Sequence, residues 1–411
     1  MNNFFHSQKT DDVPGCPARH RAGVVALWNL LFCMATAFAG EASELTSPSL
    51  TKDGYAIPQP GYRFSFPRDH GSHPDFKLEW WYITGHLRSA GGRRFGFQAT
   101  FFREAGPNQT SEPEASAGFA HRPLFLGHMA LLDVADGRFL HQSRLNRSGW
   151  DAGSTTNHLE VWNGNWRLSG AYRQIHPQWS EASQLDLHLV GTVRGDALLD
   201  LQLTPEKPLV VFGTNGVSRK ANSPSAASHY LTFPRLKTKG SLVLDGESLV
   251  VEGLSWMDHE ISSGQLGENQ VGWDWACLQL KDGRDIMTYR LRNSDGSTDP
   301  NSSLTWVNTE GATTPVGPDQ FRWKPTRTWK SPVTGASYPN RVRIETTDPA
   351  SGKPISLDLE PLSEQQELVD ELSGVAYWEG GCRVRDAEGR EIGQAFLELT
   401  GYSASLASRL K

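Results

Sequence analysis

Two aromatic-rich segments that resemble each other constrain this chain more than any other feature. The first runs from His73 to Leu87 and contains Glu-Trp-Trp-Tyr, and the second runs from Gly272 to Leu280 and contains Trp-Asp-Trp. Each leads through a glycine-containing turn into a second apolar run ending in arginine, at 95–103 and at 286–292. Two similar hairpins predict two copies of one β-architecture, with an interior lined by indole rings and a few carboxylates.

The first 39 residues are expected to be a signal peptide. Arg19 and Arg21 precede an apolar run, 22–35, that is too short to span a bilayer as a mature helix. The sequence Ala-Phe-Ala at 37–39 has the small-x-small form of a signal-peptidase site. We therefore expect cleavage before Gly40 and a periplasmic or secreted mature protein.

Charge and cysteine content narrow the function classes. The formal net charge is −6, and the leader itself is slightly basic, so the mature chain is near −7. Nucleic-acid binding usually needs a basic excess, so we expect no nucleic-acid partner. Only Cys277 and Cys382 lie beyond the leader. Pairing of these thiols after export and two separate buried cysteines are both open alternatives.

Alternating apolar and polar residues predict an all-β chain. Period-2 alternation recurs at 185–189, 199–203 and 357–359, and many such runs end at Gly, Asn, Asp or Pro. Antiparallel strands with one wet face produce this pattern. Only 363–372 and the last ten residues have a helical pattern.

The mature length fits two domains, with a boundary where the composition changes. Residues 215–228 are small, polar and serine-rich, which predicts a long loop over a cavity mouth. A new series of strand patterns begins after Pro234. We therefore place a signal peptide at 1–39, an N-terminal domain at 40–235 and a C-terminal domain at 236–411.

Several motifs resemble those of the AttH-like family, which is related to carotenoid hydratases (CrtC). They are Phe-Pro-Arg-Asp-His-Gly at 66–71, Glu-Trp-Trp-Tyr-Ile-Thr-Gly-His-Leu at 79–87, Trp-Met-Asp-His-Glu at 256–260, Gly-Trp-Asp-Trp at 272–275, Tyr-Trp-Glu-Gly at 377–380 and Leu-Glu-Leu-Thr-Gly-Tyr at 397–402. The resemblance covers almost the whole mature chain. It implies two lipocalin-like antiparallel β-barrel or sandwich domains packed side by side. The family includes carotenoid hydratases, fungal hydratases and pericyclases, and exported bacterial members of unknown activity that accompany transport systems.

Motifs of common enzyme classes are missing from the sequence. It has no GxSxG, P-loop, Rossmann or HExxH motif, which argues against ordinary hydrolase, nucleotide and zinc-protease chemistry. Its 14 tryptophans are compatible with cofactor-free hydration of an alkene. In that reaction a carboxylic acid protonates one carbon and an activated water adds to the resulting cation. Indole faces stabilise a cation, and an apolar pocket keeps a carboxyl protonated.

Four residues are candidates for this chemistry. Asp258, Asp274 and Glu79 are candidate acids, and His259 is the candidate that activates water. Adjacent residues of a strand point to opposite faces. Asp258 and His259 are therefore expected on opposite faces of one strand, and so are Asp274 and the tryptophans on either side of it. Either Asp274 lies outside while the indoles fill a core, or it faces a cavity while they pack against the other domain. Structural hydrogen bonds are the alternative role for these four, with Arg103 as a partner for Glu79.

Aromatic residues are the candidate ligand contacts, and packing is the alternative role for them. No pair of residues has a diagnostic metal-ligand spacing, so no metal is expected, although nearby histidines could complete a site at 258–260. The candidate ligand contacts are Trp80, Trp81, Tyr82, Trp256, Trp273, Trp275 and Tyr289.

Two functional hypotheses follow, and neither needs a cofactor. The first is an exported lipocalin-like protein that binds an apolar or amphipathic small molecule, such as a lipid or isoprenoid, as an accessory of an envelope ABC transporter. The second is a hydratase or isomerase of a polyene or isoprenoid, resembling carotenoid hydratase. The signal peptide favours the binding protein, because carotenoid hydration belongs with membrane-bound pathways.

Overall fold

Almost all regular structure in the chain is β-strand. The computed structural model describes residues 48–106, 121–370, 372 and 374–405. The expected signal peptide and its cleavage site therefore lie outside the described residues. Between them, the described segments contain two short 3-10 helices, η1 (Arg68–His70) and η5 (Glu181–Ser183). No helix in these segments is long and apolar enough to cross a bilayer.

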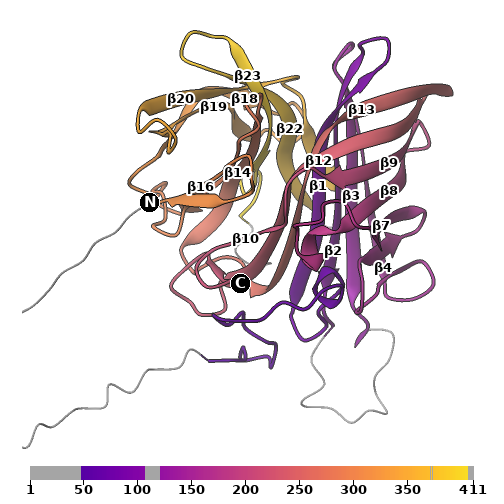
Figure 1. Cartoon of the computed structure of the whole chain (residues 1–411), viewed down its shortest axis with the longest axis vertical. Coiled ribbons are helices and arrows are strands. Elements are labelled where there is room, and N and C mark those ends of the chain that lie inside the picture. The colour runs from indigo at the N-terminus through magenta and orange to yellow at the C-terminus, as the bar shows by residue number, and fades with distance from the viewer. Residues whose placement is uncertain (1–47, 107–120, 371, 373, 406–411) are drawn as a thin grey trace, which may run out of the picture. The chain divides into compact units, whose positions relative to one another are not determined.

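The strands form two antiparallel sheets, which lie side by side in Figure 1. The strands of the first sheet are β1 (Leu78–Ser89), β2 (Arg94–Glu104), β3 (Leu124–Asp133), β4 (Arg138–Arg147), β5 (Ala152–Ser154), β6 (Glu160–Asn163), β7 (Trp166–Tyr172), β8 (Leu185–Val193), β9 (Ala197–Pro205), β10 (Val210–Phe212), β11 (Ser218–Arg219), β12 (Ala227–Leu244) and β13 (Glu247–Gly264). Strands β4 and β5, at opposite ends of the strand order, come into contact, so this sheet curls towards a barrel.

The second sheet follows in the sequence and occupies the orange to yellow part of Figure 1. Its strands are β14 (Gln270–Leu280), β15 (Asp285–Asn293), β16 (Ser303–Val307), β17 (Thr313–Val316), β18 (Arg322–Lys330), β19 (Ser337–Thr347), β20 (Pro354–Pro361), β21 (Glu367–Asp370), β22 (Val375–Arg385) and β23 (Glu391–Leu399). The all-β prediction is confirmed.

The two sheets share one strand order, which agrees with the repeat seen in the sequence. In the first sheet the order begins β4-β3-β2-β1-β13-β12, and in the second it begins β17-β16-β15-β14-β23-β22. In each sheet the first strand pairs with the next strand of its hairpin and with the last strand of the sheet. Trp80 and Trp273 therefore occupy corresponding strands.

The change of sheet falls after Gly264, whereas the sequence analysis placed a domain boundary near residue 236. Strand β12 continues through residue 236 and only shifts register between Phe233 and Leu236. Pro234 lies at that irregularity, which explains why the sequence pattern is interrupted there although the strand goes on. The domain limits themselves stay a prediction.

The expected helix at 363–372 is wrong. Residues Glu367–Asp370 form β21, which pairs with the start of β22. The backbone of Glu379 on β22 also donates to Gln366 just before β21. Pairing with a neighbouring strand satisfies the backbone there, so the weak local helical pattern does not decide the structure. The C-terminal pattern lies mostly outside the described residues.

Each sheet has an apolar core of its own, and a third apolar cluster lies between the sheets. Trp81 and Ile83 belong to the first core, and Trp378 belongs to the second. The third cluster contains Tyr82 from the first sheet and Trp275 from the second. Both faces of the central strands are therefore buried, one against the sheet's own core and the other against the opposite sheet.

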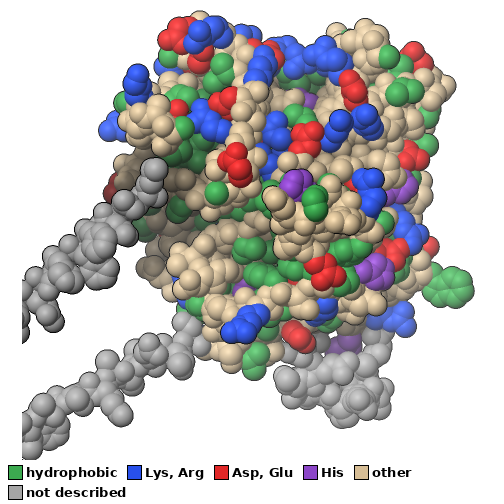
Figure 2. All heavy atoms as spheres, viewed as in Figure 1, with side chains coloured by type: hydrophobic (Ala, Val, Ile, Leu, Met, Phe, Trp, Pro, Cys, Tyr) green, Lys and Arg blue, Asp and Glu red, His purple; other side chains and the backbone are tan. Residues whose placement is uncertain are grey.

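The visible surface carries charges of both signs. Figure 2 shows Lys and Arg side chains interspersed with Asp and Glu on one face of the molecule. Cys277 and Cys382 are both buried and both free. Cys277 lies in the cluster between the sheets and Cys382 in the second core, so the two thiols belong to different layers.

Candidate functional site

A cavity of about 340 Å³ lies between the two sheets. Its walls are mainly aromatic and aliphatic, with a small number of carboxyl and hydroxyl groups. Such a concave, mostly apolar space with few polar groups is the usual form of a small-molecule site. Five of the seven aromatic candidates from the sequence line it, and these are Trp80, Tyr82, Trp273, Trp275 and Tyr289.

The first sheet forms one wall of the cavity through a row of side chains that crosses six strands. The strand register places Tyr230, Glu260, Trp80, Phe102, Leu126 and Leu145 opposite one another in that order, from β12 to β4. All six line the cavity. The row is polar on β12 and β13 and apolar from β1 to β4. We call Trp80, Phe102, Leu126 and Leu145 the apolar row.

The second sheet forms the opposite wall through a shorter row. Tyr289, Trp275, Glu398 and Glu379 lie opposite one another on β15, β14, β23 and β22, and all four line the cavity. Glu398 and Glu379 are direct cross-strand neighbours, where two negative charges would repel each other. The Nε1–H of Trp273 donates to Glu398 Oε2 at 3.1 Å.

Asp258 is a buried acid at this cavity with only neutral partners. Its carboxyl accepts hydrogen bonds from Tyr230 (2.7 Å), Thr232 (2.6 Å) and Trp256 (2.7 Å). Burial raises the pKa of Asp258 to about 7, although these three donors act in the opposite direction. The carboxyl therefore holds a proton in an appreciable fraction of molecules near neutral pH. Trp275 donates to the Tyr230 hydroxyl at 3.0 Å, which ties the second sheet to this group.

Glu398 and Glu379 also retain protons. Burial raises the pKa of Glu398 to about 7, and the Trp273 N–H opposes that change. Burial, followed by the charge of Glu398, holds the pKa of Glu379 well above its usual range. Glu379 Oε1 and the Tyr82 hydroxyl are both buried and lack a well-formed hydrogen bond among the described residues. Tyr82 and Tyr377 lie close enough to Glu379 to act on its carboxyl, so weak contacts within the wall occupy these atoms.

Lys220 brings the nearest side-chain cation to the polar end of the cavity. Its Nζ lies 3.4 Å from Glu260 Oε2 and 4.7 and 4.3 Å from the ring centres of Tyr230 and Tyr289. The ion pair with Glu260 and the two aromatic faces satisfy this ammonium. Lys220 comes from the 215–228 segment that was expected to cover a cavity mouth, so that segment does supply a lining residue.

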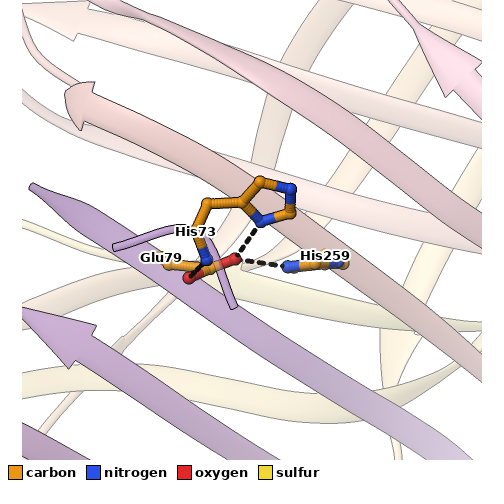
Figure 3. A group of neighbouring side chains, drawn as sticks. All are labelled: His73, Glu79 and His259. Atoms are coloured by element: carbon orange, nitrogen blue, oxygen red, sulfur yellow. Dashed lines mark hydrogen bonds and ion pairs between the residues drawn. The ribbon is translucent and has the colours of Figure 1, made fainter. Parts of the chain in front are cut away.

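A second buried cluster lies around Glu79. His73 Nδ1 and His259 Nε2 contact Glu79 Oε1 at 2.8 and 2.9 Å, as Figure 3 shows. Arg103 Nε donates to Glu79 Oε2 at 3.0 Å, and His73 also contacts Asp69 at 3.1 Å. Burial would raise the pKa of Glu79, but hydrogen bonds from His259 and His73 and the charge of Arg103 hold it well below its usual range.

The Glu79 cluster contains the one set of described residues whose geometry could hold a metal ion. One atom each of His73, Glu79 and His259 lie within 4.8 Å of one another. The same atoms are already joined by hydrogen bonds, and the guanidinium of Arg103 contacts the same carboxylate. A cation next to the carboxylate opposes binding of a divalent metal. The arrangement is that of a hydrogen-bonded ion cluster.

Two of the four catalytic candidates lie at the cavity, and only one of those is a suitable acid. Asp258 and Glu79 both line it. Glu79 is fully paired and ionised, so it cannot donate a proton. His259 lies on the opposite face of β13 from Asp258, stacked on Trp81 with ring centres 4.8 Å apart. His259 therefore does not line this cavity, and a role for it in activating water stays a prediction.

Asp274 occupies a structural environment with arginine partners, which is the alternative to a catalytic role given for it above. Its carboxyl contacts Arg292 at 3.0 Å and Arg290 at 3.4 Å, and it accepts a hydrogen bond from Tyr402 at 2.9 Å. It faces away from the cavity, while Trp273 and Trp275 on either side of it face the cavity. It points neither to solvent nor to the cavity, because two partly buried arginines lie on its side of the strand.

The remaining aromatic candidates pack around the site without lining it. Trp81 belongs to the first core and donates to the backbone of His70 at 3.3 Å. Trp256 supports Asp258 through its indole N–H.

Sequence reasoning missed several polar lining residues. Glu379 and Glu398 stand in the motifs at 377–380 and 397–402, which were used only to identify the resemblance. The alternation Leu397-Glu398-Leu399 does mark Glu398 as facing away from the second core. His128 and Tyr377 also line the cavity and are hydrogen-bonded across the two sheets at 2.7 Å. No sequence pattern indicates that contact.

Comparison with known proteins gives a consistent fold and family. The sequence model of the AttH-like family matches residues 57–402. A solved structure assigned as an AttH from Nitrosomonas europaea is 33% identical, covers 84% of this chain and 99% of its own, and has a TM-score of 0.72. Kievitone hydratase from Nectria haematococca is 16% identical over 87% of this chain and 97% of its own, with a TM-score of 0.60, and shares the fold.

One curated relative also matches part of the chain. The ceramide-binding protein svf1 of Schizosaccharomyces pombe is 28% identical over 152 residues. The match covers 33% of this chain and 40% of that protein, so well under half of the relative's length is represented.

Proposed function

The chain belongs to the AttH-like family, and we propose that this member binds an apolar or amphipathic small molecule in the cavity between its two sheets. The cavity itself carries the proposal, because it is enclosed by aromatic and aliphatic side chains from both sheets. Burial of an apolar ligand there would be favourable by roughly 25 cal/mol per Å² of apolar surface removed from water. The ceramide-binding relative supports a lipid-like ligand.

Binding of dodecanol, measured by equilibrium dialysis, tests this proposal. Leu126 lies in the middle of the apolar row and is only partly buried, so Leu126→Trp fills part of the cavity. We expect this variant to bind dodecanol at least about tenfold more weakly, a loss of about 1.4 kcal/mol. The control is Val250→Trp, which adds the same indole at a side chain that is 77% exposed. Equal binding by the two variants would show that the cavity is not the site.

A second candidate function is acid-catalysed addition of water to an alkene, and the environment of Asp258 favours it. A carboxyl with a pKa near 7 beside Tyr82 and Trp275 can donate a proton near neutral pH and then accept one back. The proton goes to one alkene carbon, water adds to the cation formed at the other, and the water's excess proton returns to the carboxylate. Since His259 is turned away, the Asp258 carboxylate formed in the first step is the group that accepts the proton of the water.

The catalytic candidate is tested with a lycopene-type acyclic carotenoid and mass spectrometry. The native protein should yield a product heavier by one water, and Asp258→Asn should abolish that product while retaining the bound polyene. The isostere keeps the shape of the side chain and loses the acid. If the native protein gives no such product, the protein is a binding protein for this ligand class and not its hydratase.

Export to the periplasm or the medium stays a proposal, and so does an envelope transporter as a partner. The basis is the leader-like sequence of residues 1–39. Sequencing the N-terminus of the protein from its native cells should give a chain that starts near Gly40. Recovery of the full leader on the mature protein would contradict export by this route.

A further inference from the structure

We propose that the cavity selects amphiphiles whose head group is a hydrogen-bond donor, an amine or a hydroxyl, and rejects those with an anionic head. The head would lie among Asp258, Glu379 and Glu398, with the tail along the apolar row towards β4. This inference rests on the binding function proposed above and specifies the class of ligand. Three features of the cavity support it, which are the charges on its wall, its weakly paired polar atoms and the direction of the apolar row.

The charges on the cavity wall are the first observation. Asp258, Glu379 and Glu398 line the cavity, and no ion pair involves any of the three among the described residues. We call them the uncompensated carboxyls. The two cations on the wall are already paired, Lys220 with Glu260 and Arg103 with Glu79. The pKa values of Asp258 and Glu398 are both about 7, so at pH 8 these carboxyls are mostly ionised and an anionic head group would meet negative charge without a counter-charge.

Weakly paired polar atoms inside the cavity are the second, independent observation. Glu379 is 1% exposed and Tyr82 is 7% exposed, and both line the cavity. Glu379 Oε1 and the Tyr82 hydroxyl lack a well-formed hydrogen bond among the described residues. A ligand that completes the hydrogen bonding of such buried atoms gains affinity from it. A hydroxyl head can donate to Glu379 and accept from it, and an ammonium can donate to it, whereas a carboxylate can only accept, so the rejection of an anion rests on the charges of Asp258 and Glu398.

The direction of the apolar row is the third observation. Strands in a sheet lie about 4.8 Å apart, so β13 and β4 are separated by roughly 19 Å along the sheet. Glu260 stands at the β13 end of the row, and Leu145 at the β4 end is 41% exposed. On the first sheet the wall therefore changes from polar to hydrocarbon along one line and reaches solvent at its apolar end, while Glu398 and Glu379 on the opposite wall lie across from β1 and β2, where the apolar row begins. This is the shape that a single extended alkyl chain with one polar end would fill.

Three amphiphiles with the same alkyl chain separate the possible outcomes. Isothermal titration calorimetry would compare dodecylamine, dodecanol and dodecanoate below their critical micelle concentrations at pH 8. We expect dodecylamine and dodecanol to bind, and dodecanoate to bind at least about tenfold more weakly than either. Dodecanoate binding as tightly as dodecanol would overturn the selectivity while leaving the binding function intact. Failure of all three to bind would contradict the binding function itself.

A matched pair of variants locates the source of the selectivity. Glu398→Gln removes one uncompensated carboxyl, so we expect the ratio of the dissociation constants for dodecanoate and dodecanol to fall by severalfold. The control is Glu388→Gln, since Glu388 has a side chain that is 65% exposed and lies outside the cavity. If Glu398→Gln keeps both the native ratio of dodecanoate to dodecanol affinity and the native melting temperature, these carboxyls do not set the preference.

Discussion

At the scale of single residues, partners rather than burial decide which carboxyls are ionised. Asp258 and Glu79 are both almost completely buried, at 2% and 1% exposure. Asp258 has neutral donors only, and burial raises its pKa to about 7. Glu79 faces Arg103 and two histidines, and its pKa falls well below the usual range. The two acids therefore make opposite contributions to the pH dependence of stability.

Asp258 is expected to make the folded protein less stable as the pH rises. Its pKa is 3.8 in the reference state and about 7 in the folded protein, so the folded chain binds the extra proton between these values. The stabilisation is complete below the reference pKa and is lost as the pH rises through the folded pKa. The pKa difference corresponds to roughly 4 kcal/mol in the free energy of unfolding. In urea denaturation over this pH range, the free energy of unfolding should decline less steeply for Asp258→Asn than for the native protein. Identical declines would mean that the carboxyl is not protonated in the folded state.

Glu79 should contribute stability of the opposite sign. Its folded pKa lies below the reference value of 4.5, so its contribution is present above pH 4.5 and is lost as the pH falls further. Glu79→Gln leaves the guanidinium of Arg103 buried without its counter-charge. We therefore expect the free energy of unfolding to fall by about 3–5 kcal/mol at neutral pH. Glu104→Gln, at an exposed neighbouring position, is the control. Equal stability of the two variants by urea denaturation would contradict the ion cluster.

Strand parity explains both the success and the failure of the residue predictions. It correctly separates Asp258 from His259 and groups Asp258 with Glu260. It cannot say which face of a strand meets the cavity, because both faces of these strands are buried and both carry aromatic side chains. Asp274 shows the same limit, since its arginine partners stand on a neighbouring strand 16 and 18 residues further on. Such contacts depend on register, which a local pattern does not encode.

At the scale of elements, the repeated hairpin was the most reliable sequence signal. Strands β1 and β14 each pair with the next strand and with the last strand of their sheet. In both sheets an aromatic residue on the first strand faces a carboxyl on the last, Tyr82 opposite Asp258 and Trp275 opposite Glu398. Two acids with raised pKa values thus occupy corresponding places. The switch between sheets falls in the small, polar run 262–269, which was passed over because the longer serine-rich segment 215–228 gives a stronger signal of the same kind.

Arg235, which lies next to the expected domain boundary, joins the two sheets through an ion pair. Arg235 on β12 and Lys207 contact the carboxyl of Asp285 on β15 at 2.6 and 2.5 Å, and all three are buried. Asp285→Asn leaves two buried cations uncompensated, so we expect the free energy of unfolding to fall by about 3–5 kcal/mol. Asp358→Asn removes an exposed ion pair with Arg343 and should cost at most about 1 kcal/mol. Similar melting temperatures for these two variants would contradict a structural role for the junction.

At the scale of the whole molecule, the site is a property of the two sheets together. Each sheet buries one face in its own core, and the cavity forms where the other faces meet. Neither sheet alone contains both the apolar row and the carboxyls of β22 and β23. The family resemblance predicted two lipocalin-like units from the sequence. It could not predict a cavity between them, because that depends on how two separately encoded surfaces fit.

Mass spectrometry of the protein as isolated from its native cells tests the central claim most directly. Under native conditions the protein should carry a bound small molecule, which organic extraction should identify as an amphiphile with an uncharged or cationic head. The Leu126→Trp variant, prepared in the same way, should carry much less of it, while Val250→Trp should carry the native amount. Native protein that carries no small molecule, and takes none up from a total lipid extract of those cells, would contradict the account.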